Sequence, residues 1–216
     1  TGVKTCLFNI GAEITLMASV HHGYPLYVLE NGGVEQDADE WWAAMCQTTR
    51  TLFAQSGITP DEVAGISFCS QMQGLVLVDK LGNALRRPMS YMDQRAKAEI
   101  REGMAHGVQI AGANVIKLMR SLMITGAVSS SVKDPVWKYK WVQKHEPDVF
   151  RNVYRWLDVK EYLLCRCTGA FVMTEDSAFS TFLYDTRPGK RGWNASLCHM
   201  LGVNMAHLPE VVKATD

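Results

Sequence analysis

The stretch that most constrains the fold and function of this chain runs from Ile66 to Arg95. It reads as an apolar strand, a polar link at Gln71-Met72-Gln73-Gly74 and a second apolar strand. A hairpin turn at 81–83 follows, and an Asp93-x-Arg95 pair then opens a helix. Because glycine lets the backbone turn where a larger residue would block a ligand, strands that stop at such a link predict a binding cleft.

Charge and apolar content exclude several classes of protein. The 22 basic and 22 acidic side chains give a formal net charge of zero, so the sequence lacks the basic excess that favours nucleic acid or a membrane surface. No apolar run approaches the roughly 18 residues that span a bilayer. The six cysteines lack a paired spacing, which favours reduced, buried thiols in a cytoplasmic protein over a disulfide framework. We expect a globular protein of one large or two small domains.

Local signals place most of the helices and strands. Two early strands are predicted on either side of a turn at 9–11, and a short strand is predicted at 171–174. Four helices are predicted from a capping residue or an N-terminal proline: one from Asp37 to Gly57, one from Asp134-Pro135 with its lysines facing outward, one from Asp158 to Gly169, and one from Asn194 to about Gly202. The first is also supported by residues that recur at helical spacing, namely Trp42, Met45, Cys46, Thr49, Leu52 and Phe53. Strands early and helices late favour an α/β layer architecture.

Six segments of the sequence occur in the same order as the motifs of a known protein family. They are Thr1-Gly2-Val3-Lys4, the stretch from Gln36-Asp37 to Trp41-Trp42, Gln71-Met72-Gln73-Gly74 with the strand to Asp79, Tyr91-Met92-Asp93-Gln94-Arg95, Pro135 to Pro147 with Lys138 and Trp141, and Asp158 to Gly169. Together they resemble the N-terminal part of the FGGY family of carbohydrate kinases, and their motifs are most similar to those of xylulokinase-like members. Six motifs in sequence order are specific, whereas any one alone is weak.

The resemblance implies a fold and a set of partners. The fold is a ribonuclease-H-like, actin-type ATPase domain, with a mixed sheet flanked by helices. Residues 1–216 would form an incomplete N-terminal domain, truncated at both ends, whose C-terminal domain is a missing partner. The resemblance further implies a sugar substrate, with ATP and Mg²⁺ as cofactors, and is compatible with a homodimer. Neither nucleic acid nor a membrane is an expected partner.

Roles of individual residues also follow from the resemblance. Met72 and Gln73 would contact the sugar, and Asp93 and Arg95 would be supporting or substrate-side groups. Gly2 and Lys4 resemble the end of a phosphate loop and are the expected cofactor-binding residues.

The remaining catalytic groups are expected outside this chain. The family's general base is an Asp expected after the chain ends, so it is not assigned to Asp216. No catalytic residue and no metal ligand is therefore expected within 1–216, and the isolated chain is expected to lack turnover.

Two departures from the family pattern affect these assignments. Gln73 stands where xylulokinase-like members usually have His, and a neutral amide can hydrogen-bond a sugar but cannot titrate near neutral pH. The 133–135 region also differs from the common form, which leaves the identity of the sugar open. An alternative function is a non-catalytic sugar-binding or scaffold protein on the same fold.

Each candidate residue also has a structural interpretation. Met72 can be a core methionine, and Asp93 and Arg95 can be a helix cap and a surface charge. The tryptophans at 41, 42, 137 and 141 fall at helical spacing, which favours packing over a stacking platform.

Three further motifs favour no site. Neighbouring side chains point apart on a strand, so His21-His22 indicates solvated histidines rather than metal ligands. Cys165 and Cys167 would project about 200° apart on a helix, which argues against chelation. Asn194-Ala195-Ser196 matches a glycosylation sequon that is attributed to chance.

Overall fold

The computed structural model describes residues 1–110 and 112–215, which form two compact units. The first, here called the hairpin unit, comprises Thr1–Tyr27 and Gln36–Cys69. The second, here called the core unit, comprises Val28–Glu35 and Ser70–Asp216. Each unit is described separately below.

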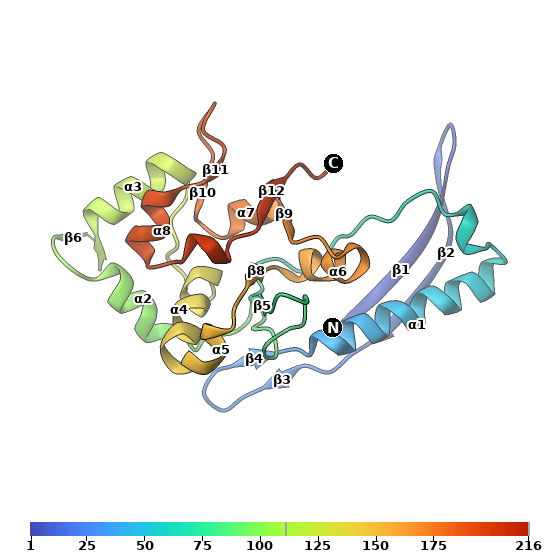
Figure 1. Ribbon diagram of the computed structural model, residues 1–216, viewed down its shortest axis with the longest axis horizontal. Coiled ribbons are helices and arrows are strands. Elements are labelled where there is room, and N and C mark those ends of the chain that lie inside the picture. Colours follow the sequence, from blue (N-terminus) through green and yellow to red (C-terminus); the bar gives the residue numbers. More distant parts are fainter. Residues whose placement is uncertain (111, 216) are drawn as a thin grey trace. The chain divides into compact units, whose positions relative to one another are not determined.

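The hairpin unit is a long antiparallel strand pair with one helix alongside it (Figure 1). Strands β1 (Gly2–Ile10) and β2 (Ile14–Gly23) pair from Gly2 with Gly23 to Ile10 with Ile14. The turn therefore lies at 11–13, two residues later than the sequence predicts, because Asn9 and Ile10 continue the ladder. The unit also contains helix α1 (Ala38–Ser56) and the 3₁₀ helix η1 (Pro60–Glu62).

Helix α1 has the predicted ends. Asp37 caps it by accepting from the Asp39 amide, and Gly57 ends it in the left-handed region with φ 72°. The fully buried side chains are Ala38, Trp41, Ala44, Thr48 and Leu52, whereas Trp42, Met45, Cys46, Thr49 and Phe53 are partly buried. Small residues on this face permit a close approach to β1, where Thr48 Oγ1 lies 2.6 Å from Thr5 Oγ1.

The predicted strand at 66–70 is absent. Residues 63–71 have no assigned helix or strand, and the Ile66 side chain is 73% exposed. A strand requires a neighbouring strand to pair its backbone groups, and no strand pairing of this stretch is found among the described residues. The apolar sequence was therefore not sufficient to produce a strand here.

The core unit contains short strands and most of the helices. In chain order its elements are β3 (Tyr27–Val28, whose first residue belongs to the hairpin unit), β4 (Val34–Glu35), β5 (Val76–Val78), α2 (Lys97–Met104), β6 (Gln109–Ile110), β7 (Ala113–Asn114), α3 (Val115–Thr125), α4 (Pro135–His145), α5 (Pro147–Arg151), β8 (Arg155–Leu157), α6 (Val159–Thr168), β9 (Val172–Thr174), α7 (Glu175–Ser180), β10 (Tyr184–Asp185), β11 (Gly192–Trp193), α8 (Ala195–Leu201), η2 (Met205–His207) and β12 (Glu210–Val212). The predicted helices that begin after Asp134, Asp158 and Asn194 are confirmed, as is the strand at 172–174.

Strand pairing in the core unit is mixed. Strand β5 pairs antiparallel with β8, whereas β9 pairs parallel with β12. The described strands pair two at a time. Met89 also forms isolated bridges to Leu75, which precedes β5, and to Glu35 of β4. The predicted turn after β5 is confirmed, because Gly82 has φ 82° and the Asp79 amide donates to the Asn83 carbonyl. Mixed pairing with helices on either side agrees with the predicted α/β class.

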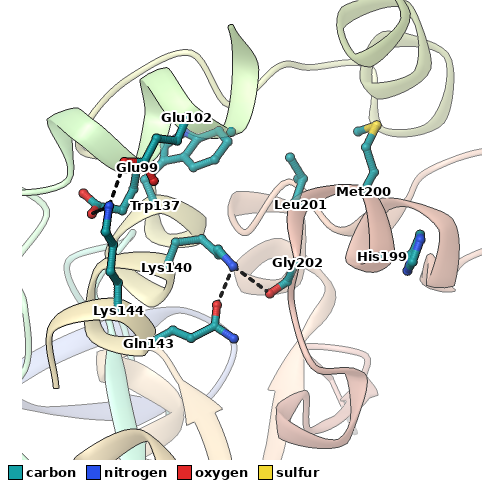
Figure 2. A pocket seen from close by; sticks show the side chains of 11 residues that line it. Glu99, Glu102, Trp137, Lys140, Gln143, Lys144, His199, Met200, Leu201 and Gly202 are labelled. Carbon is teal, nitrogen blue, oxygen red and sulfur yellow. Dashed lines mark hydrogen bonds and ion pairs between the residues drawn. The ribbon is translucent and has the colours of Figure 1, made fainter. Parts of the chain in front are cut away.

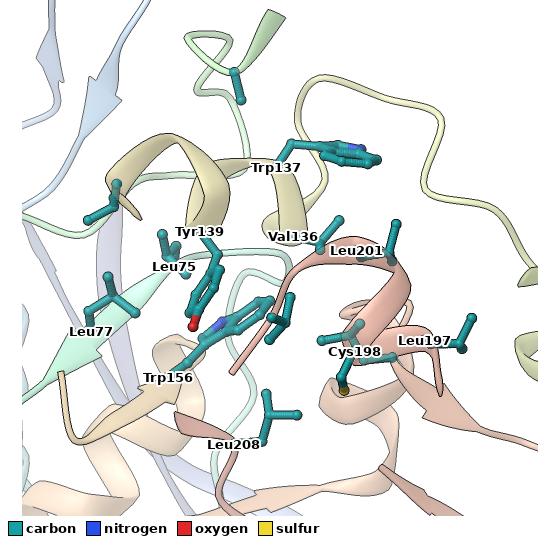
Figure 3. Packing of buried hydrophobic residues seen from close by; sticks show 14 of the residues in the cluster. Leu75, Leu77, Val136, Trp137, Tyr139, Trp156, Leu197, Cys198, Leu201 and Leu208 are labelled. Atoms are coloured by element: carbon teal, nitrogen blue, oxygen red, sulfur yellow. The ribbon is translucent and has the colours of Figure 1, made fainter. Parts of the chain in front are cut away.

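Helix α4 lies at the centre of the hydrophobic core (Figure 3). Its Val136, Trp137 and Tyr139 pack with β5, β8 and α8, and the Tyr139 ring stacks on Trp156 with 5.1 Å between centroids. A helix that is buried on most sides must place every residue of its inner turns against protein. Lys138 on this helix is therefore also buried, with 0% exposure, and the prediction that the lysines face outward was wrong for this residue.

Two other expectations were also wrong. Helix α2 begins at Lys97 with Ala96 at its N-cap, so Asp93 does not cap it. All six cysteines are free thiols as predicted, but only Cys165 and Cys198 are buried. No helix in the described ranges is long and apolar enough to cross a membrane.

Candidate substrate site

The polar link at 71–74 forms a turn in which one residue adopts an unusual backbone conformation. Gln73 has φ 62°, in the left-handed region that non-glycine residues rarely occupy. The Met72 side chain is 54% exposed, and that of Gln73 is half-buried. Two predicted substrate residues therefore lie side by side on a turn whose conformation needs external support.

Asp158 supports this turn from the amide side. Its Oδ2 accepts from the Gln73 amide at 2.9 Å, and its Oδ1 accepts from the Gly74 amide at 3.0 Å. A Cβ on Gly74 would lie 2.8 Å from Asp158 Oδ1, which explains why glycine follows Gln73. Asp158 also caps α6 by accepting from the Val159 amide at 2.8 Å.

The Asp158 carboxyl is fully enclosed, and its pKa reflects that. Burial first, and then the neighbouring Glu161 carboxylate, raise the pKa of Asp158 to about 7. The three backbone amides oppose this shift because they stabilise the charged form. The group is therefore close to a change of charge at neutral pH.

Lys138 supports the same turn from the carbonyl side. Its Nζ donates to the Gln73 carbonyl oxygen at 2.7 Å, and no part of the residue reaches solvent. Burial lowers the pKa of Lys138 to about 8, while the negative charges of Asp93, Asp158 and Asp134 oppose that shift. One residue, Gln73, is thus held at both its N–H and its C=O by ionisable side chains.

Asp93 and Arg95 belong to a buried ionic network. Asp93 is 0% exposed and accepts from Arg95 Nη2 at 2.7 Å, and Arg95 Nη2 also donates to Glu35 Oε1 at 2.6 Å. Asp93 Oδ2 accepts from the Val34 amide at 2.9 Å. The Arg95 guanidinium lies 4.4 Å from the centre of the Trp141 ring.

Arg86 extends this network to Glu146, between α4 and α5. It donates to Glu35 Oε1 at 2.5 Å and to Glu146 Oε2 at 2.7 Å. Because the side chain of Arg95 is only 4% exposed and its hydrogen bonds go to protein, the geometry favours the supporting role for Asp93 and Arg95 over direct contact with a sugar.

The two expected cofactor residues lie in the hairpin unit. Gly2 and Lys4 are both in β1, where Lys4 pairs with His21 and is exposed. A Cβ on Gly2 would lie 2.4 Å from the His21 ring, so the hairpin's own side chain fills the space beside it. Their role in binding a phosphate stays a prediction.

Sequence reasoning did not assign Lys138 and Asp158 to the site. Lys138 was noted only within a helix motif and Asp158 only as a helix cap. Both residues adjoin apolar residues in the sequence, and this was the one local indication that they are buried. Only the fold shows that both contact Gln73, since each is more than 60 positions away from it in the sequence.

A surface pocket of about 430 Å³ lies elsewhere in the core unit (Figure 2). Its lining includes Glu99, Trp137, Lys140 and His199 but none of the residues around Gln73. Lys140 Nζ donates to the Gly202 carbonyl and to Gln143, and Lys144 pairs with Glu102, so its cations are engaged with protein groups. We assign it no role in substrate binding.

Comparison with known proteins gives a consistent result. The whole chain, residues 1–216, matches the model of the N-terminal domain of the FGGY family of carbohydrate kinases. It is 26% identical to a xylulose kinase of Bacillus subtilis (strain 168), covering 100% of this chain and 40% of that protein. It is also 26% identical to a xylulose kinase of Escherichia coli (strain K12), covering 100% of this chain and 41% of that protein. The chain therefore spans about 40% of the length of these curated relatives.

Solved structures support the predicted fold. The ligand-bound xylulose kinase from Lactobacillus acidophilus superposes with a TM-score of 0.83 at 24% identity, covering 100% of this chain and 41% of that one. The gluconate kinase from Lactobacillus acidophilus gives the same TM-score and identity, covering 100% of this chain and 40% of that one. The predicted actin-like ATPase fold is confirmed.

Proposed function

Because this chain belongs to the FGGY family of carbohydrate kinases, we propose that it supplies the sugar-binding side of an ATP-dependent sugar kinase. The reaction would transfer a phosphoryl group from ATP to a hydroxyl of a ketopentose such as xylulose, or of a related sugar or polyol. Two curated relatives named xylulose kinase support the ketopentose. Two structures of equal TM-score are named for different sugars, so the fold itself does not select one.

The observation that carries the proposal is the supported turn at Met72 and Gln73. Sugar hydroxyls are both donors and acceptors, and the Gln73 amide can donate two hydrogen bonds and accept two. The exposed Met72 adds an apolar, adaptable surface for the carbon face of the sugar. Gln73 cannot abstract a proton, so within this chain the turn binds and orients the sugar and leaves the proton transfer to another group.

ATP and Mg²⁺ are the cofactors that kinase chemistry requires. In the described ranges no three His, Cys, Asp or Glu side chains are grouped so as to hold a metal ion. Magnesium in kinases is held largely by substrate phosphates with one or two carboxylates, so a dedicated cage is not needed. We assign no residue in the described ranges to the metal.

A coupled assay of ATP consumption tests the proposal. The complete gene product that carries residues 1–216 would be supplied with ATP, Mg²⁺ and a panel of ketopentoses, other sugars and polyols. We expect turnover with at least one ketopentose. Gln73→Ala should raise the KM for the sugar about tenfold or more and leave the KM for ATP unchanged, because hydrogen bonds to the sugar are lost. Gln47→Ala, an exposed glutamine of α1, is the matched control.

Calorimetry with the same panel separates the alternatives. Binding of a sugar without turnover in the complete gene product would favour the non-catalytic sugar-binding protein. If no sugar in the panel binds, the role proposed for Met72 and Gln73 is wrong.

A further inference from the structure

We infer that Lys138 and Asp158 are positioning residues that hold the Gln73 peptide in its left-handed conformation and thereby set the affinity for the sugar. The inference rests on the proposed function, because it concerns the turn to which we assign the sugar. Neither residue is placed in contact with the sugar. Both would act through Gln73.

The first step is that the Gln73 conformation needs an external cause. Left-handed backbone brings Cβ close to the following carbonyl oxygen in every residue except glycine. Gln73 also lacks the short side chain with which Asn or Asp stabilises this conformation locally. The structure gives Gln73 a different kind of support, since its backbone N–H and C=O both bind side chains from distant parts of the chain.

The second step is that this support comes from charged groups on rigid elements. Asp158 stands at the start of α6, directly after β8, and Lys138 is in the second turn of α4. Hydrogen bonds to charged groups are stronger than those between neutral ones. Asp158 spans two successive amides with its two oxygens, so it fixes the orientation of the turn as well as its position.

The third step concerns the burial of Lys138. Placing an ammonium in a protein interior is unfavourable, and the neighbouring residues of α4, Val136, Trp137 and Tyr139, are the large apolar side chains that such a position ordinarily holds. The Lys138 Nζ donates to the Gln73 carbonyl at 2.7 Å. A positioning role for that bond explains why the core contains a lysine at this position.

The arrangement has a consequence for specificity. Lys138 and Asp158 bind residues 73 and 74 through backbone atoms, the Gln73 amide and carbonyl and the Gly74 amide. The side chains of Met72 and Gln73 stay available to the ligand. Position 73 can therefore change which sugar is preferred while Lys138 and Asp158 keep the same backbone geometry.

The test combines a local structural measurement with a binding measurement. Lys138→Met and Asp158→Asn would be made in the complete gene product. Amide hydrogen exchange at residues 73 and 74 reports the turn directly, and calorimetry with the sugar found by the coupled assay, or with xylulose, reports affinity. We expect exchange at these amides at least about tenfold faster, and a sugar Kd raised about tenfold or more, with kcat at saturating sugar changed less.

Lys140→Met is the matched control. Lys140 lies on the same helix and also donates to a backbone carbonyl, that of Gly202, but it does not contact the turn. Its loss should leave both exchange at 73–74 and the sugar Kd unchanged. If Lys138→Met does not fold, Asp158→Asn carries the test, because it preserves the size and shape of the side chain.

The outcomes distinguish this inference from the proposed function. Faster exchange at 73–74 with an unchanged sugar Kd would overturn the inference, as would unchanged exchange in both variants. If the unaltered protein binds no sugar, the proposed function is wrong and so is the effect on affinity. The exchange rates would then still show whether Lys138 and Asp158 hold Gln73.

Discussion

Two buried aspartates of the core unit, Asp93 and Asp158, are stabilised in different ways. Asp93 is balanced by the Arg95 guanidinium at 2.7 Å, in a network that continues to Glu35. Asp158 is held by backbone amides of residues 73, 74 and 159, and its pKa is raised to about 7 by burial. The Asp93 carboxylate is therefore balanced by the positive charge of Arg95, whereas the Asp158 carboxyl is stabilised by the dipoles of backbone amides.

This difference indicates that Asp93 supports the core unit and that Asp158 controls the conformation of the turn at Gln73. The Asp93 network joins β4, the segment that contains Arg86, and Glu146 between α4 and α5 through side-chain ion pairs. Two of the three hydrogen bonds of Asp158 go to one turn, at Gln73 and Gly74, which directly follow the exposed Met72 in the sequence. We therefore expect changes at Arg95 to act mainly on stability and changes at Asp158 to act mainly on the turn.

The largest effect is expected from Arg95→Met. The substitution leaves Asp93 and Glu35 buried without their shared cation, which typically costs about 3–5 kcal/mol of unfolding free energy. Chemical denaturation of the variant and of the unaltered protein measures the difference. Arg151→Met removes an exposed ion pair with Asp148 and should cost about 1 kcal/mol or less. A loss at Arg95 no larger than that of Arg151→Met would show that the network does not stabilise the core unit.

An intermediate effect is expected from pH at Asp158. Its folded pKa of about 7 lies above the ordinary aspartate pKa of 3.8, so between these values the native state binds one more proton at this group than the unfolded state does. Stability relative to Asp158→Asn should therefore fall as pH rises through this window, by roughly 1 kcal/mol per pH unit. Denaturation of both proteins at several pH values from 4 to about 7 measures the difference.

Asp185 should give a change of stability with pH of the opposite sign. The Arg187 guanidinium lowers the pKa of Asp185, so the charged form is favoured in the folded state. Its contribution to stability is present above the ordinary pKa of an aspartate and is lost as pH falls. The unaltered protein should therefore gain stability relative to Asp185→Asn as pH rises. A curve of the same sign for both aspartates would contradict the distinction between charge pairing and burial.

Features that depend on neighbouring residues in the sequence were predicted well. The N-caps Asp37, Asp158 and Asn194 and the C-cap glycines at 57, 169 and 202 each lie where the sequence places them. Capping is decided within one turn of helix, so a few residues determine it. The order of six family motifs extended these local signals to the fold.

Features that depend on distant partners were predicted poorly. The lysines of the helix after Asp134 were predicted to face outward, yet Lys138 is buried and donates to the Gln73 carbonyl, 65 positions away. The apolar run at 66–70 resembles a strand, yet no strand pairing of it occurs in the part of the chain that the structure describes. The Asp93 and Arg95 pair was predicted, but its burial follows from Glu35 and Trp141, which no local pattern connects to it.

The smallest effect is expected at Gln73 itself. Gln73→Gly removes the steric cost of the left-handed conformation, roughly 1–2 kcal/mol, and adds a backbone entropy cost of about 0.5–1 kcal/mol. The net change in unfolding free energy should be a gain of up to about 1 kcal/mol, measured by denaturation. Gly169→Ala is the matched reverse change, at φ 75° with no atom within 4 Å of the new Cβ, and it should lose about 1 kcal/mol. A clear loss for Gln73→Gly would mean that the Gln73 side chain itself stabilises the turn, and the bonds from Asp158 and Lys138 would then not be what holds it.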